Sequence, residues 1–335
     1  MIPNSRLITI KNNLEQVQTL LDELVLQPRL NALKWALITK QTPNIKIGYP
    51  GQHLASLITG MEGERTGARG NDLCDGSEVK SCSRIDQLDE CAECKSPVAR
   101  IEKNCSECAS AKIIRKNDSK WLFTIRSQED LNVLINDVGR VVLVLGDYPN
   151  FDDDDFDTLR FQVFEVWPEN MRHRRFVELM VNYYQKIYLV HKEKNPEKTP
   201  APKNFWPYSY QFYMCNPIQT FSCTVKNAYS QPIISIEKYI EPSTDRTELS
   251  SEDMPAGVLN ESELDQIFQN ATLGQLSKCL INPSVPITEN IWAKLKFKEK
   301  INLFSGINES LRECLELRDT DRTSTSKSVY KRRKS

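Results

Sequence analysis

The hydrophobic positions of the first sixty residues follow a helical period. In residues 11–27 they lie three or four positions apart, at Leu14, Val17, Leu20, Leu21, Leu24 and Val25. This spacing places apolar side chains on one face and predicts an amphipathic helix that Pro28 interrupts. The pattern resumes over residues 29–40, and residues 45–60 predict a glycine-rich bend followed by a further helix. We therefore expect a helical N-terminal region over residues 1–60.

Runs with strand character follow in the middle of the chain. They are rich in β-branched and aromatic residues or alternate in polarity, and they occur at residues 76–84, 121–125, 140–149 and 159–168. Residues 127–138 and 169–192 carry the helical period instead. Strand, helix and strand in succession predict a core of the α/β (α+β) class.

The pattern changes again after residue 192. Residues 192–204 are charged and proline-rich, which predicts a linker or exposed loop, and residues 205–225 predict short strands. Two or three helices are expected over residues 259–280 and 287–304. We expect four regions: a helical N-terminal region (1–60), a core (61–195) with a cysteine-rich insertion (86–116), a partly helical C-terminal region (196–317) and a basic flexible tail (318–335).

Composition limits the class of protein. The 335 residues are 39% hydrophobic and 27% charged, which is typical of a globular chain. A formal net charge of −1 argues against a uniformly basic, histone-like nucleic-acid binder. The N-terminus lacks the features of a signal peptide, and no apolar run is long enough to span a membrane. We expect a cytoplasmic protein with no membrane partner.

Acidic residues and a lysine gather between Asp72 and Lys80. Hydrolysis of a phosphodiester needs an activated water and one or two divalent cations. On a strand, Glu78 and Lys80 share a face and can approach one metal ion. Asp72, with Asp75 as its rival, precedes them on a turn and offers a second hard oxygen ligand for Mg²⁺. We predict that Asp72, Glu78 and Lys80 are catalytic, with Lys80 positioning the water or lowering its pKa.

The order Asp-x5-Glu-x-Lys resembles the catalytic signature of the PD-(D/E)XK nuclease superfamily. Upstream, KIGYPGQHLASLITG resembles a helix that precedes the active-site strand in nucleases of the MutH and Sau3AI group. That helix carries a further metal-binding glutamate, and Ala55 stands at its position here. Glu62 or Glu64 is a candidate to replace it, or the site works with Asp72 and Glu78 alone.

Two longer segments resemble the MamI family of type II restriction endonucleases. They are TGARGNDLCDGSEVKSCSRIDQLDECAEC and NFWPYSYQFYMCNP, and the likeness extends over residues 45–225. The resemblance implies a Mg²⁺-dependent bacterial endonuclease with a restriction-endonuclease-like core. It also implies a homodimer that cuts double-stranded DNA at an interrupted palindrome with GAT and ATC half-sites. A companion DNA methyltransferase would protect the host genome, with no direct contact implied.

Four cysteines have the spacing of a metal site. Cys91-x2-Cys94 and Cys105-x2-Cys108 form two knuckles separated by ten residues. This spacing predicts a tetrahedral Zn²⁺ site, and four protein ligands make the ion structural. An iron–sulfur cluster and redox pairs are the alternatives. The other six cysteines have no such spacing, and we expect them to be ordinary core or surface residues.

Two basic clusters are candidates for contacts to DNA phosphates, although charge clusters of this kind usually form solvated surface. The first begins a helix at Arg172, Arg174 and Arg175, and the second closes the chain at Lys331, Arg332, Arg333 and Lys334. Base-reading residues are not identified, although helices between residues 260 and 305 are candidates.

Two other functions remain open from the sequence. Glu78 and Lys80 also fit a surface ion pair, in which case the chain is a zinc-ribbon nucleic-acid-binding protein without catalysis. A repair or mobile-element nuclease that recognises DNA structure is the second alternative. Cleavage of DNA into discrete fragments would distinguish the three.

Overall fold

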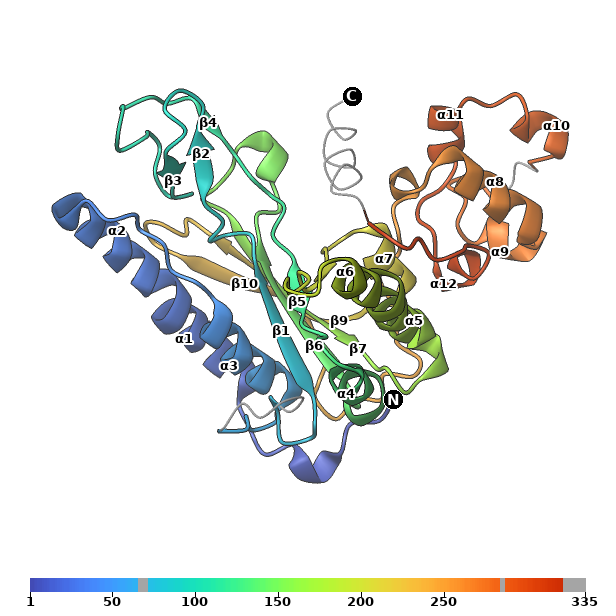
Figure 1. Ribbon diagram of the computed structural model, residues 1–335, viewed down its shortest axis with the longest axis horizontal. Coiled ribbons are helices and arrows are strands. Elements are labelled where there is room, and N and C mark those ends of the chain that lie inside the picture. Colours follow the sequence, from blue (N-terminus) through green and yellow to red (C-terminus); the bar gives the residue numbers. More distant parts are fainter. Residues whose placement is uncertain (66–71, 284–286, 322–335) are drawn as a thin grey trace.

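A mixed five-stranded sheet forms the centre of the protein in the computed structural model, which describes residues 1–65, 72–283 and 287–321 (Figure 1). Its strands lie in the order β1 (Glu78–Ser83), β6 (Val141–Asp147), β7 (Leu159–Val166), β9 (Ile218–Lys226) and β10 (Ile233–Tyr239). β1 runs parallel to β6, and the other neighbours are antiparallel. The α/β class and the strands expected at 140–149 and 159–168 are confirmed.

The N-terminal helices cover one face of this sheet, beside β1 (Figure 1). They are α1 (Asn13–Leu21), α2 (Gln27–Thr39) and α3 (Gly48–Thr59). The break expected at Pro28 is wrong, because a π-helical segment, Asp22–Leu26, joins α1 to α2 without interruption. Pro28 occupies one of the first positions of α2, where its missing N–H costs little.

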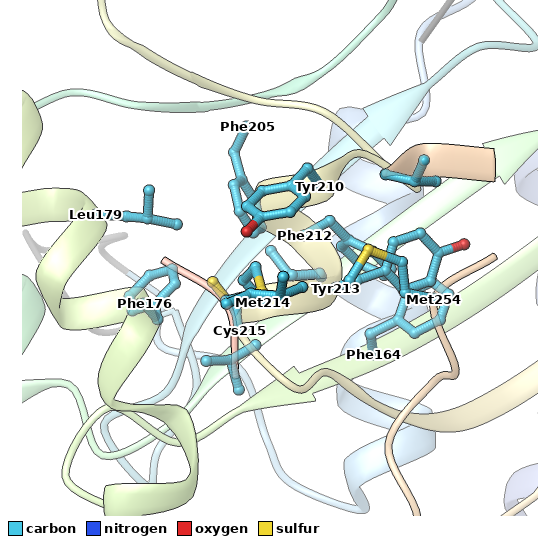
Figure 2. Close-up of a cluster of buried hydrophobic side chains, with 14 of the residues drawn as sticks. Phe164, Phe176, Leu179, Phe205, Tyr210, Phe212, Tyr213, Met214, Cys215 and Met254 are labelled. Carbon is cyan, nitrogen blue, oxygen red and sulfur yellow. The ribbon is translucent and has the colours of Figure 1, made fainter. Parts of the chain in front are cut away.

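Helices and an aromatic layer cover the opposite face. The helices are α4 (Gln128–Asn132), α5 (Arg174–Asn182), α6 (Leu189–Lys194) and α7 (Tyr210–Met214). A small sheet of β5 (Trp121–Phe123) and β8 (Lys203–Phe205) accompanies them. Figure 2 shows Phe164 of β7 close to Phe212 and Tyr213 of α7 within this core. Burial of such large rings contributes much of the stability of this face.

The expected strands over residues 205–225 are only partly confirmed, because α7 takes the place of the first ones. Aromatic residues favour strands, but the Ser209 hydroxyl accepts a hydrogen bond from the Phe212 N–H and caps a short helix. The expected loop at 192–204 ends in β8. Strands β9 and β10 follow it in sequence and join the central sheet, so the sheet includes strands from both sides of residue 195.

Short helices form a lobe at the C-terminal end (Figure 1). They are α8 (Glu261–Asn270), α9 (Leu273–Ser277), α10 (Glu289–Trp292), α11 (Phe297–Ile301) and α12 (Glu309–Arg312). Four of them, α8 to α11, lie where two or three helices were expected, because Thr272 ends the first run and caps a new helix with Gln275. Arg318 pairs with Glu263, so the start of the expected tail contacts the lobe.

A third, three-stranded sheet holds the cysteine-rich insertion. Its strands are β2 (Asp89–Cys91), β3 (Pro97–Val98) and β4 (Ile113–Ile114), in the order β3-β2-β4. Figure 1 shows this insertion at one end of the central sheet, after β1. Within the described ranges, no helix has both the length and the apolar character needed to cross a membrane.

Candidate active site and metal centre

Glu78 and Lys80 lie at the amino end of β1, the first strand of the sheet. Both side chains are half-buried and form an ion pair on the face opposite α3. Val79, between them, is buried against the core beneath α3, as strand alternation requires. Lys80 Nζ also lies 5.8 Å from the centre of the Phe123 ring, which limits the space available to the ammonium group.

Asp72 lies at the open edge of β1. Its Oδ2 accepts a hydrogen bond from the Val79 N–H at 2.8 Å, a donor that β6 does not use. Its Oδ1 accepts a hydrogen bond from Gln52 Nε2 of α3 at 3.2 Å. Each carboxylate oxygen has a second lone pair, so Asp72 keeps acceptor capacity for a cation. Gln52 of α3 thus orients the first candidate metal ligand.

The other candidate carboxylates are directed elsewhere. Asp75 Oδ2 lies 2.6 Å from Nη2 of the buried Arg140, and Asp75 Oδ1 accepts from the Ser77 N–H at 3.1 Å. Glu62 Oε1 accepts from the Thr9 hydroxyl at 2.9 Å. Glu64 is exposed. Of these carboxylates, only Asp72 is hydrogen-bonded to the backbone of the strand that carries Glu78 and Lys80.

Glu78 and Lys80 border a pocket of about 300 Å³ between β1 and α4. Arg126, Glu129 and Asp130 line its other wall. Sequence reasoning missed Glu129 and Asp130 because acidic side chains are ordinary in the first turn of a helix, and it missed Arg126 because a single arginine before a helix carries no signal of its own. Only the fold places them across from the Glu-x-Lys pair.

Helix α3 cannot supply the additional carboxylate at residue 55. Ala55 is 0% exposed and belongs to the apolar core on the face of the sheet opposite the Glu78 and Lys80 side chains. A charge at this position would be buried without a partner, which is strongly unfavourable. Alanine at residue 55, where the MutH and Sau3AI group has a glutamate, is therefore consistent with the local packing.

The four cysteines converge in the insertion. All four Sγ atoms lie within 4.8 Å of one another. Cys91 Sγ lies 3.5 Å from Cys108 Sγ, and Cys94 Sγ lies 3.5 Å from Cys105 Sγ. Tetrahedral zinc–thiolate bonds of about 2.3 Å hold sulfur atoms about 3.8 Å apart, so the cluster fits such an ion. In the described part of the chain, no other group of three or more His, Cys, Asp or Glu side chains converges in this way.

Hydrogen bonds within the cluster shift two of its thiols in opposite directions. Bonds from the hydroxyl and backbone of Ser96 lower the pKa of the Cys94 thiol to about 6, whereas, against the opposing effect of the Ser110 backbone, bonds with Cys94 and Cys91 raise the pKa of the Cys108 thiol to about 12. The thiolate is the form that binds metal. Of the six other cysteines, Cys82, Cys215, Cys223 and Cys279 are buried and Cys74 and Cys314 are partly buried.

A buried aspartate holds the insertion together. Asp89 accepts hydrogen bonds from Arg100 at 2.7 and 2.8 Å, from Arg115 at 2.7 Å and from the Lys116 N–H at 2.8 Å. Nearby, Lys112 pairs with Glu93. Several basic residues of the insertion are thus engaged within it, which supports a structural role for the module.

The arginines at the start of α5 and in the 3-10 turn just before it contact the C-terminal lobe. Arg172 and Arg174 form ion pairs with Glu309 and Glu313, respectively. Arg175 pairs with Glu178 at 2.7 Å and donates to the Leu315 carbonyl at 3.2 Å. These contacts join α5 to α12 and to the segment after it. The second predicted basic cluster, Lys331, Arg332, Arg333 and Lys334, lies outside the described residues.

Comparison with known proteins gives the family of this chain. A family model of restriction enzymes, described as MamI restriction endonuclease, matches residues 34–257, which is most of the chain. The chain belongs to the MamI restriction endonuclease family.

A particular relative is the type II restriction enzyme MamI of Microbacterium ammoniaphilum, which is 41% identical over 56 residues. The aligned segment covers 17% of this chain and 18% of that enzyme. No solved structure matches the chain.

Proposed function

We propose that the protein is a Mg²⁺-dependent type II restriction endonuclease that hydrolyses double-stranded DNA at a specific sequence. Membership of the MamI family supports the class of reaction. The observation that carries the proposal is the arrangement at β1: Glu78 and Lys80 border a pocket, and Asp72 is hydrogen-bonded to Val79 between them. We further propose the interrupted palindrome with GAT and ATC half-sites as the target.

The donor groups suit a hard divalent cation. Asp72 and Glu78 offer carboxylate oxygens, which Mg²⁺ prefers, and would hold the ion. Gln52 and the Val79 N–H restrain Asp72, so little reorganisation is needed when a ligand binds. A bound cation would stabilise negative charge on the phosphoryl oxygens during hydrolysis.

Lys80 supplies the remaining chemistry. Its ammonium group lies beside Glu78 at the pocket, where it can orient a water molecule toward a phosphate and favour loss of the water's proton. Arg126, across the pocket, is suited to contact a DNA phosphate. Before a substrate enters, the charges of Glu78 and Lys80 compensate each other.

The topology supports a PD-(D/E)XK core as the fold of this proposal. β1 carries the Glu-x-Lys pair, α4 crosses over, and β6 returns parallel to β1. α3 packs closely on these two strands from the other face. Because the Glu-x-Lys pair lies on the first strand of a parallel crossover, its side chains are held by a rigid element of the sheet.

We propose Zn²⁺ as the ion of the four-cysteine cluster. Four thiolates close the coordination sphere, so the ion would stabilise the insertion without taking part in hydrolysis. We also propose that the enzyme acts as a homodimer, because a symmetric target presents two equivalent strands to two active sites. A companion methyltransferase would then protect the host DNA.

Mapping the ends of cut plasmid DNA tests the proposal. With Mg²⁺ we expect discrete fragments, and Lys80→Ala should reduce cleavage at least 100-fold while DNA binding and stability persist. Lys186→Ala is the matched control, because Lys186 is an exposed lysine paired with Asp319, outside the site. Binding without cleavage under any divalent metal would instead favour the zinc-ribbon binding protein, and cleavage only at DNA junctions or lesions would favour a repair nuclease.

A further inference from the structure

A chain of alternating buried charges ends at the turn of the candidate active site. Asp75, Arg140, Glu165 and Arg246 follow one another in space, and the last three are at most 1% exposed. Arg140 Nη2 lies 2.6 Å from Asp75 Oδ2, and Arg140 Nη1 lies 3.4 Å from Glu165 Oε1. Arg246 Nε lies 3.3 Å from Glu165 Oε2. The four formal charges cancel inside the protein.

Arg140 holds the turn before β1 through both its side chain and its backbone. Its Nε donates to Ser77 Oγ at 2.9 Å, and its carbonyl accepts from the Glu78 N–H at 3.0 Å. The Ser77 carbonyl in turn accepts from the Asp72 N–H at 2.9 Å. Arg140 therefore fixes the segment that separates the two candidate metal ligands.

The network constrains the geometry of the turn through several directed contacts. Buried ion pairs are often no more stabilising than apolar side chains of the same volume, because both charges lose their hydration. Trp167 further restricts the Arg140–Glu165 ion pair. Its Nε1 donates to Glu165 Oε2 at 3.2 Å, and its ring centre lies 5.3 Å from Arg140 Cζ. Directed contacts of this kind are suited to define the position of the turn at Asp75–Ser77.

We propose that Arg140 is a positioning residue for the metal-binding carboxylates. It keeps the turn at Asp75–Ser77 in the conformation in which Asp72 accepts from Val79 and Glu78 begins β1. This inference rests on the proposed nuclease function, in which Asp72 and Glu78 hold the cation. The Arg140 side chain contacts the turn itself, through an ion pair with Asp75 and a hydrogen bond to Ser77.

The test compares Arg140→Lys with Arg246→Lys in the full-length protein. Lysine keeps the charge in each case and loses the forked geometry of the guanidinium. Both arginines contact Glu165, but only Arg140 contacts the turn, so Arg246→Lys is the matched control. The readouts are the dissociation constant for Mn²⁺, kcat and KM for DNA cleavage, hydrogen exchange of residues 72–80, and the melting temperature.

We expect Arg140→Lys to weaken Mn²⁺ binding about tenfold or more, to lower kcat with KM for DNA unchanged, and to speed exchange in residues 72–80. Arg246→Lys should lower only the melting temperature. Equal effects of both variants on all four readouts, or no effect of Arg140→Lys on metal binding and exchange, would overturn the proposal.

A second variant covers the case in which Arg140→Lys does not fold. Asp75→Asn preserves the shape of the side chain and weakens its bond to Arg140, so we expect faster exchange in residues 72–80. Loss of Mn²⁺ binding by Asp75→Asn without faster exchange would show Asp75 to be a ligand and would refute the positioning role. Wild-type protein that neither binds Mn²⁺ nor cuts DNA would refute the nuclease function, whereas hydrogen exchange tests separately whether Arg140 holds the turn at residues 72–80.

Discussion

Gly51 of α3 lies so close to Ser81 of β1 that a β-carbon at residue 51 would stand 2.1 Å from Ser81 Oγ and 2.9 Å from Ser81 Cβ. Helix and strand can approach this closely only because residue 51 has no side chain. The contact fixes α3 against the strand that carries Glu78 and Lys80. It also places the next residue, Gln52, within reach of Asp72.

Gly51→Ala should therefore destabilise the protein by about 1–3 kcal/mol, because the extra methyl group forces α3 away from β1. Urea unfolding measures the loss. Gly48→Ala is the matched control, since a β-carbon at residue 48 meets nothing within 4 Å. Equal stability of the two variants would show that α3 does not pack on β1 in this way.

The hydrogen bond from Gln52 to Asp72 gives a second prediction. Gln52→Leu removes the donor and leaves Asp72 with one restraint, the Val79 N–H. We expect the Mg²⁺ concentration for half-maximal cleavage to rise about tenfold, because partners that orient a metal ligand affect affinity on that scale.

His53→Ala is the control for Gln52→Leu, because His53 follows Gln52 in α3 but lines a separate pocket with α1. Its Mg²⁺ dependence should match that of the wild type. A normal Mg²⁺ dependence of Gln52→Leu would mean that Asp72 is held by the backbone alone or does not bind the cation.

The parts of the fold that were predictable from sequence are those with a local cause. The runs over 140–149 and 159–168 are long and apolar, so β6 and β7 were predicted, and the cysteine spacing indicated the cluster that the structure brings together. The Glu-x-Lys alternation indicated that two side chains share a face of β1.

Other features depend on contacts between distant segments and had no local signal. Gln52 and Asp72 are twenty residues apart, and Arg140 and Asp75 are sixty-five apart. The roles of Gln52 and Arg140 become visible only when α3, β1 and β6 are packed. The helix at Tyr210–Met214 was missed for a related reason, because tertiary packing and the Ser209 cap outweigh the strand preference of its aromatic residues.

Removal of metal tests the cysteine cluster. We expect about one zinc ion per chain by elemental analysis, and Cys91→Ser or a strong chelator should remove it and unfold the insertion. Cys314→Ser is the control, because Cys314 is a partly buried cysteine remote in sequence from the cluster. Iron in place of zinc, or full zinc content in Cys91→Ser, would contradict the proposed site.

His173 provides a pH-dependent prediction at the junction of α5 with the C-terminal lobe. Its side chain is 0% exposed, Nδ1 lies 2.9 Å from the Cys215 carbonyl, and Nε2 lies 3.2 Å from Met1 Sδ. Burial lowers the pKa of His173 from 6.5 to about 4, and the nearby Arg172 adds to the effect of burial. The folded protein therefore holds this imidazole in its neutral form at pH values where the unfolded chain protonates it.

Between pH 6.5 and pH 4 the unfolded chain binds more protons at residue 173 than the folded protein, so stability must fall as the pH falls. The shift corresponds to about 3 kcal/mol, fully present above pH 6.5 and lost near pH 4. His173→Gln cannot titrate, so its unfolding free energy should decline less steeply than that of the wild type over this window. His53→Gln, at an exposed position of α3, is the matched control. Parallel slopes for wild type and His173→Gln in urea unfolding at several pH values would show that His173 is not buried in its neutral form. Carboxylates titrate in the same pH range in all three proteins. The difference in slope between a variant and the wild type therefore reports on the substituted histidine.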